Sequence, residues 1–171
     1  MIFYSGFSLI NDQRFFDAYL VESDYTVAGF SYGAIKAAHH AAHTTSRIDT
    51  LQLFSPAFFQ TKKTSFKRLQ VSAFAHDRKS YILRFLEMCF APCPVQEVDI
   101  QIGESDQLDE LLNYAWDEKL MKSIVDKGIR IEVYLGLEDA IIDAVGAKEF
   151  FLPYATVTTI RRGNHFLGEC T

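Results

Sequence analysis

The sequence predicts a single α/β domain built on a mostly parallel sheet. Short apolar runs that suit buried strands alternate with longer segments of helical character, which is the pattern of a sheet covered by helices on both faces. The chain has 171 residues, of which 49% are hydrophobic and 23% charged, enough for one core without disulfides or metals. It contains neither a repeat nor a Gly/Ser-rich linker, so we expect one domain over residues 1–171.

Five short apolar runs are predicted to be the strands of this sheet. Each is rich in aromatic or aliphatic residues and ends at polar or turn-forming residues. In chain order they are residues 1–4, 25–30, 51–54, 129–135 and 155–160. The first stops at Ser5 and Gly6, and the third stops at Ser55 and Pro56. Because functional groups of such sheets gather beyond the carboxyl ends of the strands, we expect the site at that edge.

The segments between these runs have helical periodicity or composition. In chain order, the predicted helices span residues 11–21, 34–42, 64–90, 108–125 and 144–151. Asn11 is expected to cap the first, whose large apolar side chains share one face. Gly128 follows the fourth at the position where a left-handed residue commonly ends a helix.

Composition excludes several classes of protein. With 17 Lys and Arg against 22 Asp and Glu, the net charge of −5 argues against a nucleic-acid binder. No run of about 18 apolar residues exists, so we expect no membrane span, and the first residues contain no basic secretory leader. Cys89, Cys93 and Cys170 are odd in number and lack metal-finger spacing. We therefore expect three free thiols that serve in packing, and a cytoplasmic protein.

Ser31 is the candidate nucleophile. It lies in Gly29-Phe30-Ser31-Tyr32-Gly33, a G-x-S-x-G sequence between a predicted strand and a predicted helix. The two glycines permit a sharp turn that lifts the serine hydroxyl above the sheet. The alternative is an ordinary small-residue turn that packs a helix on a sheet.

A serine nucleophile needs a base and an acid that orients the base. Asp139 and His165 each follow the carboxyl end of a later predicted strand. The chain order Ser, Asp, His is that of the α/β-hydrolases. Asp143 is a rival for the acid, but we expect it to cap the helix that begins near residue 144. The backbone amides of Phe7 and Tyr32 are the candidate oxyanion donors, although Gly6 and Phe7 could equally form a simple turn.

Residues 60–84 are predicted to belong to a small helical lid, inserted at about residues 60–110. They carry seven basic side chains and one acidic one, whereas the rest of the chain carries ten basic and 21 acidic. This bias favours an acidic partner or a phosphate-bearing substrate, although a solvated helix pair would look similar. The candidate binding residues are Lys62, Lys63, Lys67, Arg68, Arg78 and Lys79. His39 and His43 have metal-ligand spacing without a partner carboxylate, so we expect an exposed helix face and no metal site.

Several segments together resemble the BioV-type pimeloyl-(acyl-carrier protein) methyl ester esterases of the α/β-hydrolase superfamily. They are Ser5-Gly6-Phe7, the eight residues from Gly29 to Lys36, Leu53-Phe54-Ser55-Pro56, Phe66-Lys67-Arg68-Leu69-Gln70, residues 131–137 with Asp139, and Asn164-His165. The resemblance covers essentially the whole chain. It implies a compact, N-terminally shortened α/β-hydrolase with a small helical lid.

The resemblance also implies an activity, namely hydrolysis of the methyl ester of pimeloyl-acyl carrier protein in biotin biosynthesis. Ser31 would be acylated with loss of methanol, and water activated by His165 would release the product. The acidic carrier protein with its phosphopantetheine arm would face the basic lid, and no metal or organic cofactor would be needed. The alternatives are another serine esterase, an acyl thioesterase on the same fold, or a binding module without catalysis.

Overall fold

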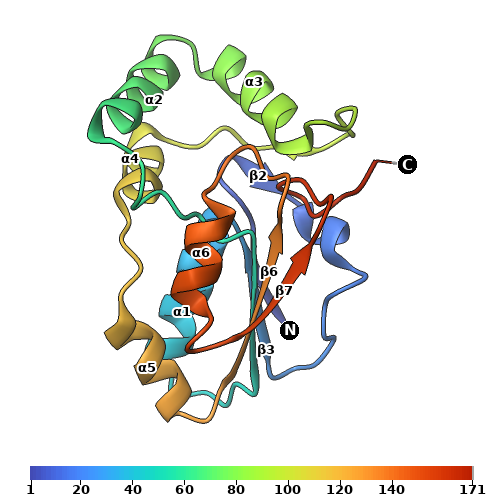
Figure 1. The fold of residues 1–171 in the computed structure, drawn as a ribbon, viewed down its shortest axis with the longest axis vertical. Coiled ribbons are helices and arrows are strands. Elements are labelled where there is room, and N and C mark those ends of the chain that lie inside the picture. Colours follow the sequence, from blue (N-terminus) through green and yellow to red (C-terminus); the bar gives the residue numbers. More distant parts are fainter. Residues whose placement is uncertain (171) are drawn as a thin grey trace.

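The structure is a computed structural model that describes residues 1–170, and its core is a five-stranded parallel sheet (Figure 1). The strands lie in the order β1-β3-β4-β6-β7, and every neighbouring pair is parallel. Their bounds are Ile2–Tyr4 (β1), Thr26–Phe30 (β3), Thr50–Phe54 (β4), Arg130–Gly136 (β6) and Thr156–Ile160 (β7). The predicted α/β class with a parallel sheet is confirmed.

Three helices cover one face of the sheet, on the left in Figure 1. They are α1 (Tyr32–His43), α5 (Glu118–Asp126) and α6 (Ala144–Phe151). Strands β3, β4, β6 and β7 are neighbours in the sheet in their chain order, and right-handed crossovers then place all the connecting helices on the same face. Helix α1 packs against β1, β3 and β4, α5 packs against α1, and α6 packs against β6.

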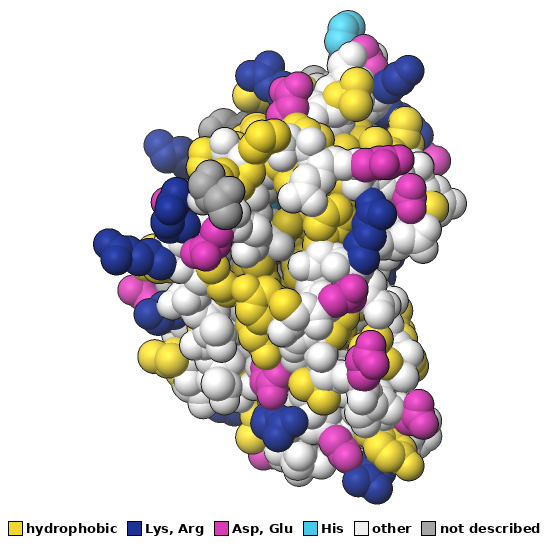
Figure 2. All heavy atoms as spheres, turned by 90° about the vertical axis from the view of Figure 1, so that its right-hand side faces the viewer, with side chains coloured by type: hydrophobic (Ala, Val, Ile, Leu, Met, Phe, Trp, Pro, Cys, Tyr) yellow, Lys and Arg dark blue, Asp and Glu magenta, His cyan; other side chains and the backbone are white. Residues whose placement is uncertain are grey.

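The opposite face is covered differently from the expectation of helices on both sides. Residues 11–21 form only a short 3-10 helix, η1 (Asp12–Phe16), and the Asn11 side chain makes no capping hydrogen bond. The reason is the buried side chain of Gln52 on β4, which bonds the Tyr19 carbonyl and the Val21 amide, each at 2.9 Å. These backbone groups are thereby satisfied outside a helix. Figure 2 shows this face, where hydrophobic side chains gather between charged ones.

Three further helices lie beyond the carboxyl edge of the sheet, toward the top of Figure 1. They are α2 (Thr64–His76), α3 (Arg78–Phe90) and α4 (Ser105–Asn113), and we call them the lid helices. Helix α2 packs against both α3 and α4. A two-stranded antiparallel ribbon of β2 (Leu9–Ile10) and β5 (Asp99–Ile100) joins the lid segment to the loop after β1. Strands of two residues are too short for alternation to reveal them in the sequence.

Two predicted helices are each divided in the structure. The segment 64–90 breaks at Asp77, whose carboxylate accepts the Ser80 amide and caps α3. The segment 108–125 breaks before α5, where the indole of the buried Trp116 donates to the Ala57 carbonyl at 2.8 Å. Gly128, with φ +78°, lies just past α5 as predicted. Within residues 1–170, no helix combines the length and the apolar character needed to cross a membrane.

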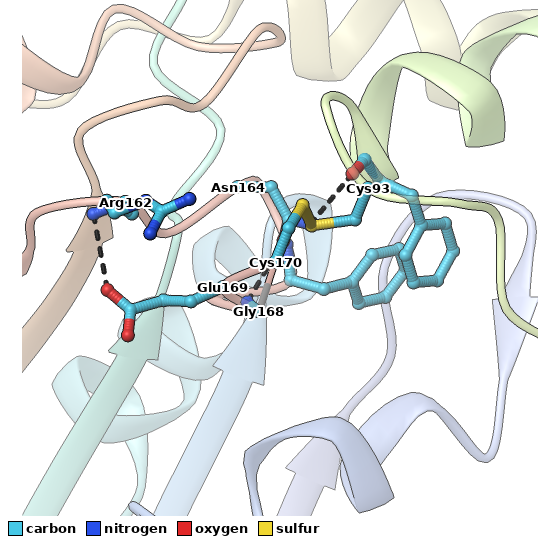
Figure 3. Close-up of a disulfide and its surroundings, with 8 residues drawn as sticks. Cys93, Arg162, Asn164, Gly168, Glu169 and Cys170 are labelled. Atoms are coloured by element: carbon cyan, nitrogen blue, oxygen red, sulfur yellow. Dashed lines mark hydrogen bonds between the residues drawn. A yellow bond between two sulfur atoms is a disulfide. The ribbon is translucent and has the colours of Figure 1, made fainter.

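Two of the three cysteines form a disulfide, so the expectation of three free thiols is wrong for them (Figure 3). Cys93 and Cys170 are 77 residues apart in sequence, but their Cα atoms lie 5.5 Å apart in the fold. Only tertiary structure reveals such a pair. Cys89 is free and buried, and its burial alone accounts for a free thiol. Because disulfides are typical of oxidising compartments, the cysteines no longer support the expectation of a cytoplasmic protein.

Candidate active site

Ser31 lies in a tight turn between β3 and α1. Its backbone has φ 51° and ψ −112°, a conformation that non-glycine residues seldom adopt. The turn is held by the Ser31 amide, which donates to the Phe54 carbonyl, and by the Ser31 carbonyl, which accepts the amides of Ala34 and Ala57. The residue as a whole is 4% exposed. A strained turn of this kind is typical of functional positions.

The glycines on either side make the turn possible. A Cβ atom on Gly29 would overlap the carbonyl of Gly33, and one on Gly33 would overlap the carbonyl of Tyr4. Both obstacles are backbone atoms, which cannot rotate away as the end of a side chain can. The spacing of the two glycines in the sequence therefore reflects a close approach of α1 to β1 and β3.

We expect Gly33→Ala to destabilise the fold by about 3 kcal/mol or more, because the strand carbonyl of Tyr4 must move to admit the methyl group. Chemical denaturation of the purified variant measures this. Gly168→Ala is the matched control, since a Cβ there would meet nothing closer than 3.6 Å. Equal stability of the two variants would contradict the packing argument.

His165 and Asp139 complete a linear arrangement with Ser31. His165 Nε2 lies 3.1 Å from Ser31 Oγ, and His165 Nδ1 lies 2.6 Å from Asp139 Oδ2. The side chains of His165 and Asp139 are fully buried. The other oxygen of Asp139 accepts the amides of Ile141 and Ile142 at 2.7 and 3.1 Å, which fixes the carboxylate. In this geometry the imidazole can accept the serine proton while the carboxylate stabilises the imidazolium.

Asp143 plays a different structural role from Asp139. It caps α6 by accepting the Gly146 amide at 3.0 Å, and it also accepts the Thr61 hydroxyl at 2.8 Å. The hydrogen bond from the Gly146 amide, followed by that from Thr61, lowers the pKa of the Asp143 carboxyl against its partial burial. The two candidate acids therefore have different partners. Asp139 bonds His165, whereas Asp143 caps the first turn of α6.

The two predicted oxyanion donors lie beside Ser31. Tyr32 is the first residue of α1, and Phe7 lines the same cavity as Ser31. Neither amide is among the hydrogen-bond donors of residues 1–170, so both are available to a ligand. The loop that carries Phe7 is held by Asp12, a fully buried residue whose Oδ2 accepts the Gly6 amide at 2.8 Å. Sequence reasoning missed Asp12, because an acid after a predicted N-cap is an ordinary first-turn residue.

A cavity of about 470 Å³ opens beside Ser31 beneath the lid helices. Each lid helix contributes residues at the i, i+3, i+4 spacing of a single helix face. The lining residues are Phe66, Leu69, Gln70 and Ala73 from α2, Tyr81, Arg84, Phe85 and Met88 from α3, Leu108, Leu111 and Leu112 from α4, together with Phe7, Ser31, Phe59, Lys62, Ala140 and Ile141. The wall is therefore mainly apolar, with a few polar groups, as in sites that bind small molecules.

Buried titratable groups near this cavity are held in their neutral forms. Burial raises the pKa of the Tyr81 phenol to about 12. Burial, followed by the charge of Asp139, raises the pKa of the Cys89 thiol well above its usual range. Burial and the hydrogen bond that Tyr32 donates to Glu110 on α4 raise the pKa of the Tyr32 phenol. At neutral pH these side chains therefore act as hydrogen-bonding or packing groups.

The six predicted basic binding residues do not act as one group. Lys62 lines the cavity, whereas Lys63, Lys67, Arg68, Arg78 and Lys79 do not line it and lie at the surface of the lid segment, all exposed except the half-buried Lys67. Arg78 pairs with Glu104 at 2.9 Å. Arg84 lines the cavity and was missed as a site residue. Its spacing of three after Tyr81 and four before Met88, which share its helix face, was the available signal.

Two histidines of α1 bond other groups of the chain. His39 and His43 are exposed, and the His39 imidazole bonds the Tyr114 hydroxyl at 2.9 Å. The His43 imidazole donates to the His39 carbonyl in the preceding turn. Within residues 1–170, no group of three or more His, Cys, Asp or Glu side chains is placed to hold a metal ion.

Comparison with known proteins finds likeness in structure but not in sequence. No family model matches the chain, and no curated protein matches it by sequence. BioG from Haemophilus influenzae superposes with a TM-score of 0.59 at 11% identity, over 97% of this chain and 88% of that one. E-2-(acetamidomethylene)succinate hydrolase gives 0.60 at 11% identity, over 96% and 84%. The chain has an α/β-hydrolase fold.

Longer α/β-hydrolases match over part of their length. A carboxylesterase of the thaumarchaeon Nitrososphaera gargenis gives a TM-score of 0.52 at 14% identity, over 82% of this chain. The chain spans 57% of that enzyme and 59% of an Exiguobacterium antarcticum esterase. At these identities the likeness concerns the fold, and the chemistry has to be argued from the side chains.

Proposed function

We propose that this α/β-hydrolase is a serine carboxylesterase that hydrolyses the methyl ester of pimeloyl-acyl carrier protein in the cytoplasm. The observation that carries the proposal is the buried line of Ser31, His165 and Asp139 at the base of an apolar cavity. The resemblance of the sequence to BioV-type esterases supplies the substrate. The Ser–His–Asp geometry and the apolar lining of the cavity support a serine esterase, independently of that resemblance.

The reaction takes place in two steps. In the first, Ser31 Oγ attacks the ester carbonyl while His165 Nε2 takes its proton, and the Phe7 and Tyr32 amides stabilise the oxyanion. The imidazolium then protonates the methoxide, methanol leaves, and the acyl group stays on Ser31. In the second, His165 takes a proton from water, the hydroxide attacks the acyl carbon, and the carboxylic acid leaves as Ser31 regains its proton.

The mainly apolar lining of the cavity suits an acyl chain. The methyl ester must reach Ser31, so the chain lies against apolar residues of the three lid helices, and the thioester end points outward. Lys62 and Arg84 are the two cations that line the cavity, and both are exposed to solvent. The sequence alone favours Arg68, and then Lys67, for the phosphate of the phosphopantetheine arm. Because neither of these lines the cavity, we propose that Lys62 and Arg84 meet the phosphate instead.

The outer cations of the lid segment would attract the acidic carrier protein. Opposite charges raise the rate of encounter, and salt screens this attraction. Charge reversal at Lys67 and Arg68 should therefore raise the KM for carrier-bound ester about tenfold at low salt, with a smaller effect at high salt. Hydrolysis of a small uncharged ester such as p-nitrophenyl acetate should hardly change, because Ser31 and its partners are untouched.

Steady-state kinetics on both substrates, at low and high salt, measure this effect. The matched control reverses two exposed lysines away from the lid, Lys119 on α5 and Lys148 on α6. It changes the net charge equally and should leave the KM for the carrier-bound ester near its normal value. Equal losses in the two double variants, or equal losses on both substrates, would contradict docking on the lid.

A growth test addresses the biological reaction. The gene should restore biotin-independent growth to a host that lacks its own pimeloyl methyl ester esterase, and the Ser31→Ala form should not. Growth with neither form would favour another ester or thioester as the substrate. Growth with both forms would contradict the serine mechanism.

A further inference from the structure

The last turn of lid helix α3 is bonded directly to the segment that carries His165. The Asn164 side-chain amide donates to the Phe90 carbonyl at 2.9 Å, and the His165 amide donates to the Cys89 carbonyl at 3.1 Å. Cys89 and Phe90 are the final residues of α3, where the carbonyls have no partner within the helix. Residues 161–170, which follow β7 and which we call the histidine loop, therefore supply the C-terminal cap of a lid helix.

Asn164 also folds the histidine loop on itself. Its side-chain oxygen accepts the amides of Phe166 and Gly168, each at 3.0 Å, and the residue is 1% exposed. The ring of Phe166 stacks on that of Phe90 with centroids 4.4 Å apart. One buried side chain thus joins three points of the backbone, two within the histidine loop and one at the end of α3.

We infer that Asn164 is a positioning residue, which holds the segment of His165 against the last turn of α3. The rate of proton transfer at Ser31 then depends on the position of this lid helix. The inference rests on the proposed role of His165 as the general base. His165 must meet Asp139 at Nδ1 and Ser31 at Nε2 simultaneously. A displacement of about 1 Å in such an arrangement can cost about a hundredfold in rate.

The disulfide is a second tie between the same two segments. Cys93 lies three residues beyond the end of α3, and Cys170 lies five residues beyond His165. Figure 3 draws the Cys93–Cys170 bond, which joins the segment after α3 to the segment after β7, together with Asn164 in its surroundings. With the disulfide intact, the covalent link limits how far the loop can move when the Asn164 bond is lost. The effect of Asn164 is therefore expected to be larger in a Cys93→Ser background.

The decisive variant is Asn164→Asp. It keeps an oxygen for the Phe166 and Gly168 amides but loses the donor to Phe90 and places a carboxylate against that carbonyl. Asn113→Asp is the matched control, because the Asn113 side chain donates in the same way to the Asp109 carbonyl within lid helix α4. If Asn164→Asp does not fold, Asn164→Ser serves instead, since its hydroxyl is too short to reach α3.

We expect Asn164→Asp to lower kcat about 10- to 100-fold with KM changed less than about twofold, and to lower kcat further in the Cys93→Ser background. Asn113→Asp should leave both constants unchanged. Retention of kcat within about threefold in both backgrounds, with the protein folded, would overturn the inference. So would a loss of kcat that, in Asn164→Asp and in Asn164→Ser alike, only follows a loss of folded protein.

A spectroscopic readout separates this inference from the proposed substrate. A proton that His165 Nδ1 donates to Asp139 across this 2.6 Å contact should give a low-field proton NMR resonance that needs no substrate. This resonance should broaden or disappear in folded Asn164→Asp and persist in Asn113→Asp. If the protein does not hydrolyse the carrier-bound ester but the resonance behaves in this way, the substrate is wrong and the positioning role stands. An unchanged resonance in Asn164→Asp overturns the positioning role.

Discussion

Replacement of Ser31 by alanine is expected to abolish ester hydrolysis and leave the protein folded. The hydroxyl is the group that would form the acyl intermediate, and His165 Nε2 is its hydrogen-bond partner. Loss of the nucleophile of a Ser–His–Asp set costs on the order of a million-fold in kcat. The substitution removes only the hydroxyl and leaves the backbone bonds of the turn intact, so the thermal midpoint should change little.

Ser55→Ala is the matched control for this experiment. Ser55 is fully buried and follows the neighbouring strand β4, and its hydroxyl has no hydrogen-bond partner within residues 1–170. Removing an unpaired hydroxyl should affect neither rate nor stability adversely. Labelling with a fluorophosphonate probe gives a second measurement: the wild type and Ser55→Ala should be labelled, and Ser31→Ala should not. Near-normal turnover by purified Ser31→Ala would rule out the serine mechanism.

Replacement of Asp139 by asparagine is expected to have the next largest effect. The carboxylate holds His165 Nδ1 at 2.6 Å, and an amide there would favour the wrong tautomer of the imidazole. The equivalent change in a serine protease lowers kcat about ten-thousand-fold. We expect a loss of this order in kcat for Asp139→Asn, with a folded protein.

Asp143→Asn is the matched control for Asp139, and it should stay within a few-fold of wild-type activity. Asparagine also caps helices, so α6 should keep its first turn. Because the Gly146 bond lowers the pKa of Asp143, this carboxylate stabilises the fold above about pH 4, and that contribution disappears as the pH falls further. A larger loss of kcat for Asp143→Asn than for Asp139→Asn would show that the acid is misassigned, although the serine mechanism would survive.

The strands were predictable because each is a short apolar run buried in a parallel sheet. Each predicted strand agrees with the structure to within one residue at either end. The positions of Ser31, Asp139 and His165 at the carboxyl ends of three strands follow from that register, because parallel strands present those ends at one edge. Side-chain contacts between remote segments were not predictable in this way.

Three features of the structure depend on contacts between residues far apart in the sequence, which no local pattern predicts. The segment 11–21 has helical periodicity, but Gln52 on a distant strand bonds its backbone in another conformation. The helix predicted over 108–125 is interrupted at Trp116 because its indole donates a hydrogen bond to the Ala57 carbonyl. Cys93 and Cys170 pair only because the histidine loop returns to the end of α3. In each case the decisive partner is more than 30 residues away, beyond the reach of any local pattern.

The most direct test of the proposed function is hydrolysis of pimeloyl-acyl carrier protein methyl ester by the purified protein, followed by mass spectrometry of the intact carrier protein. We expect the carrier to lose the mass of one methylene group as the ester becomes a free acid, with the acyl chain still attached. The Ser31→Ala protein should leave the carrier unchanged. Release of the whole acyl chain from the phosphopantetheine arm would identify a thioesterase, and an unchanged carrier with the wild-type protein would contradict the proposed function.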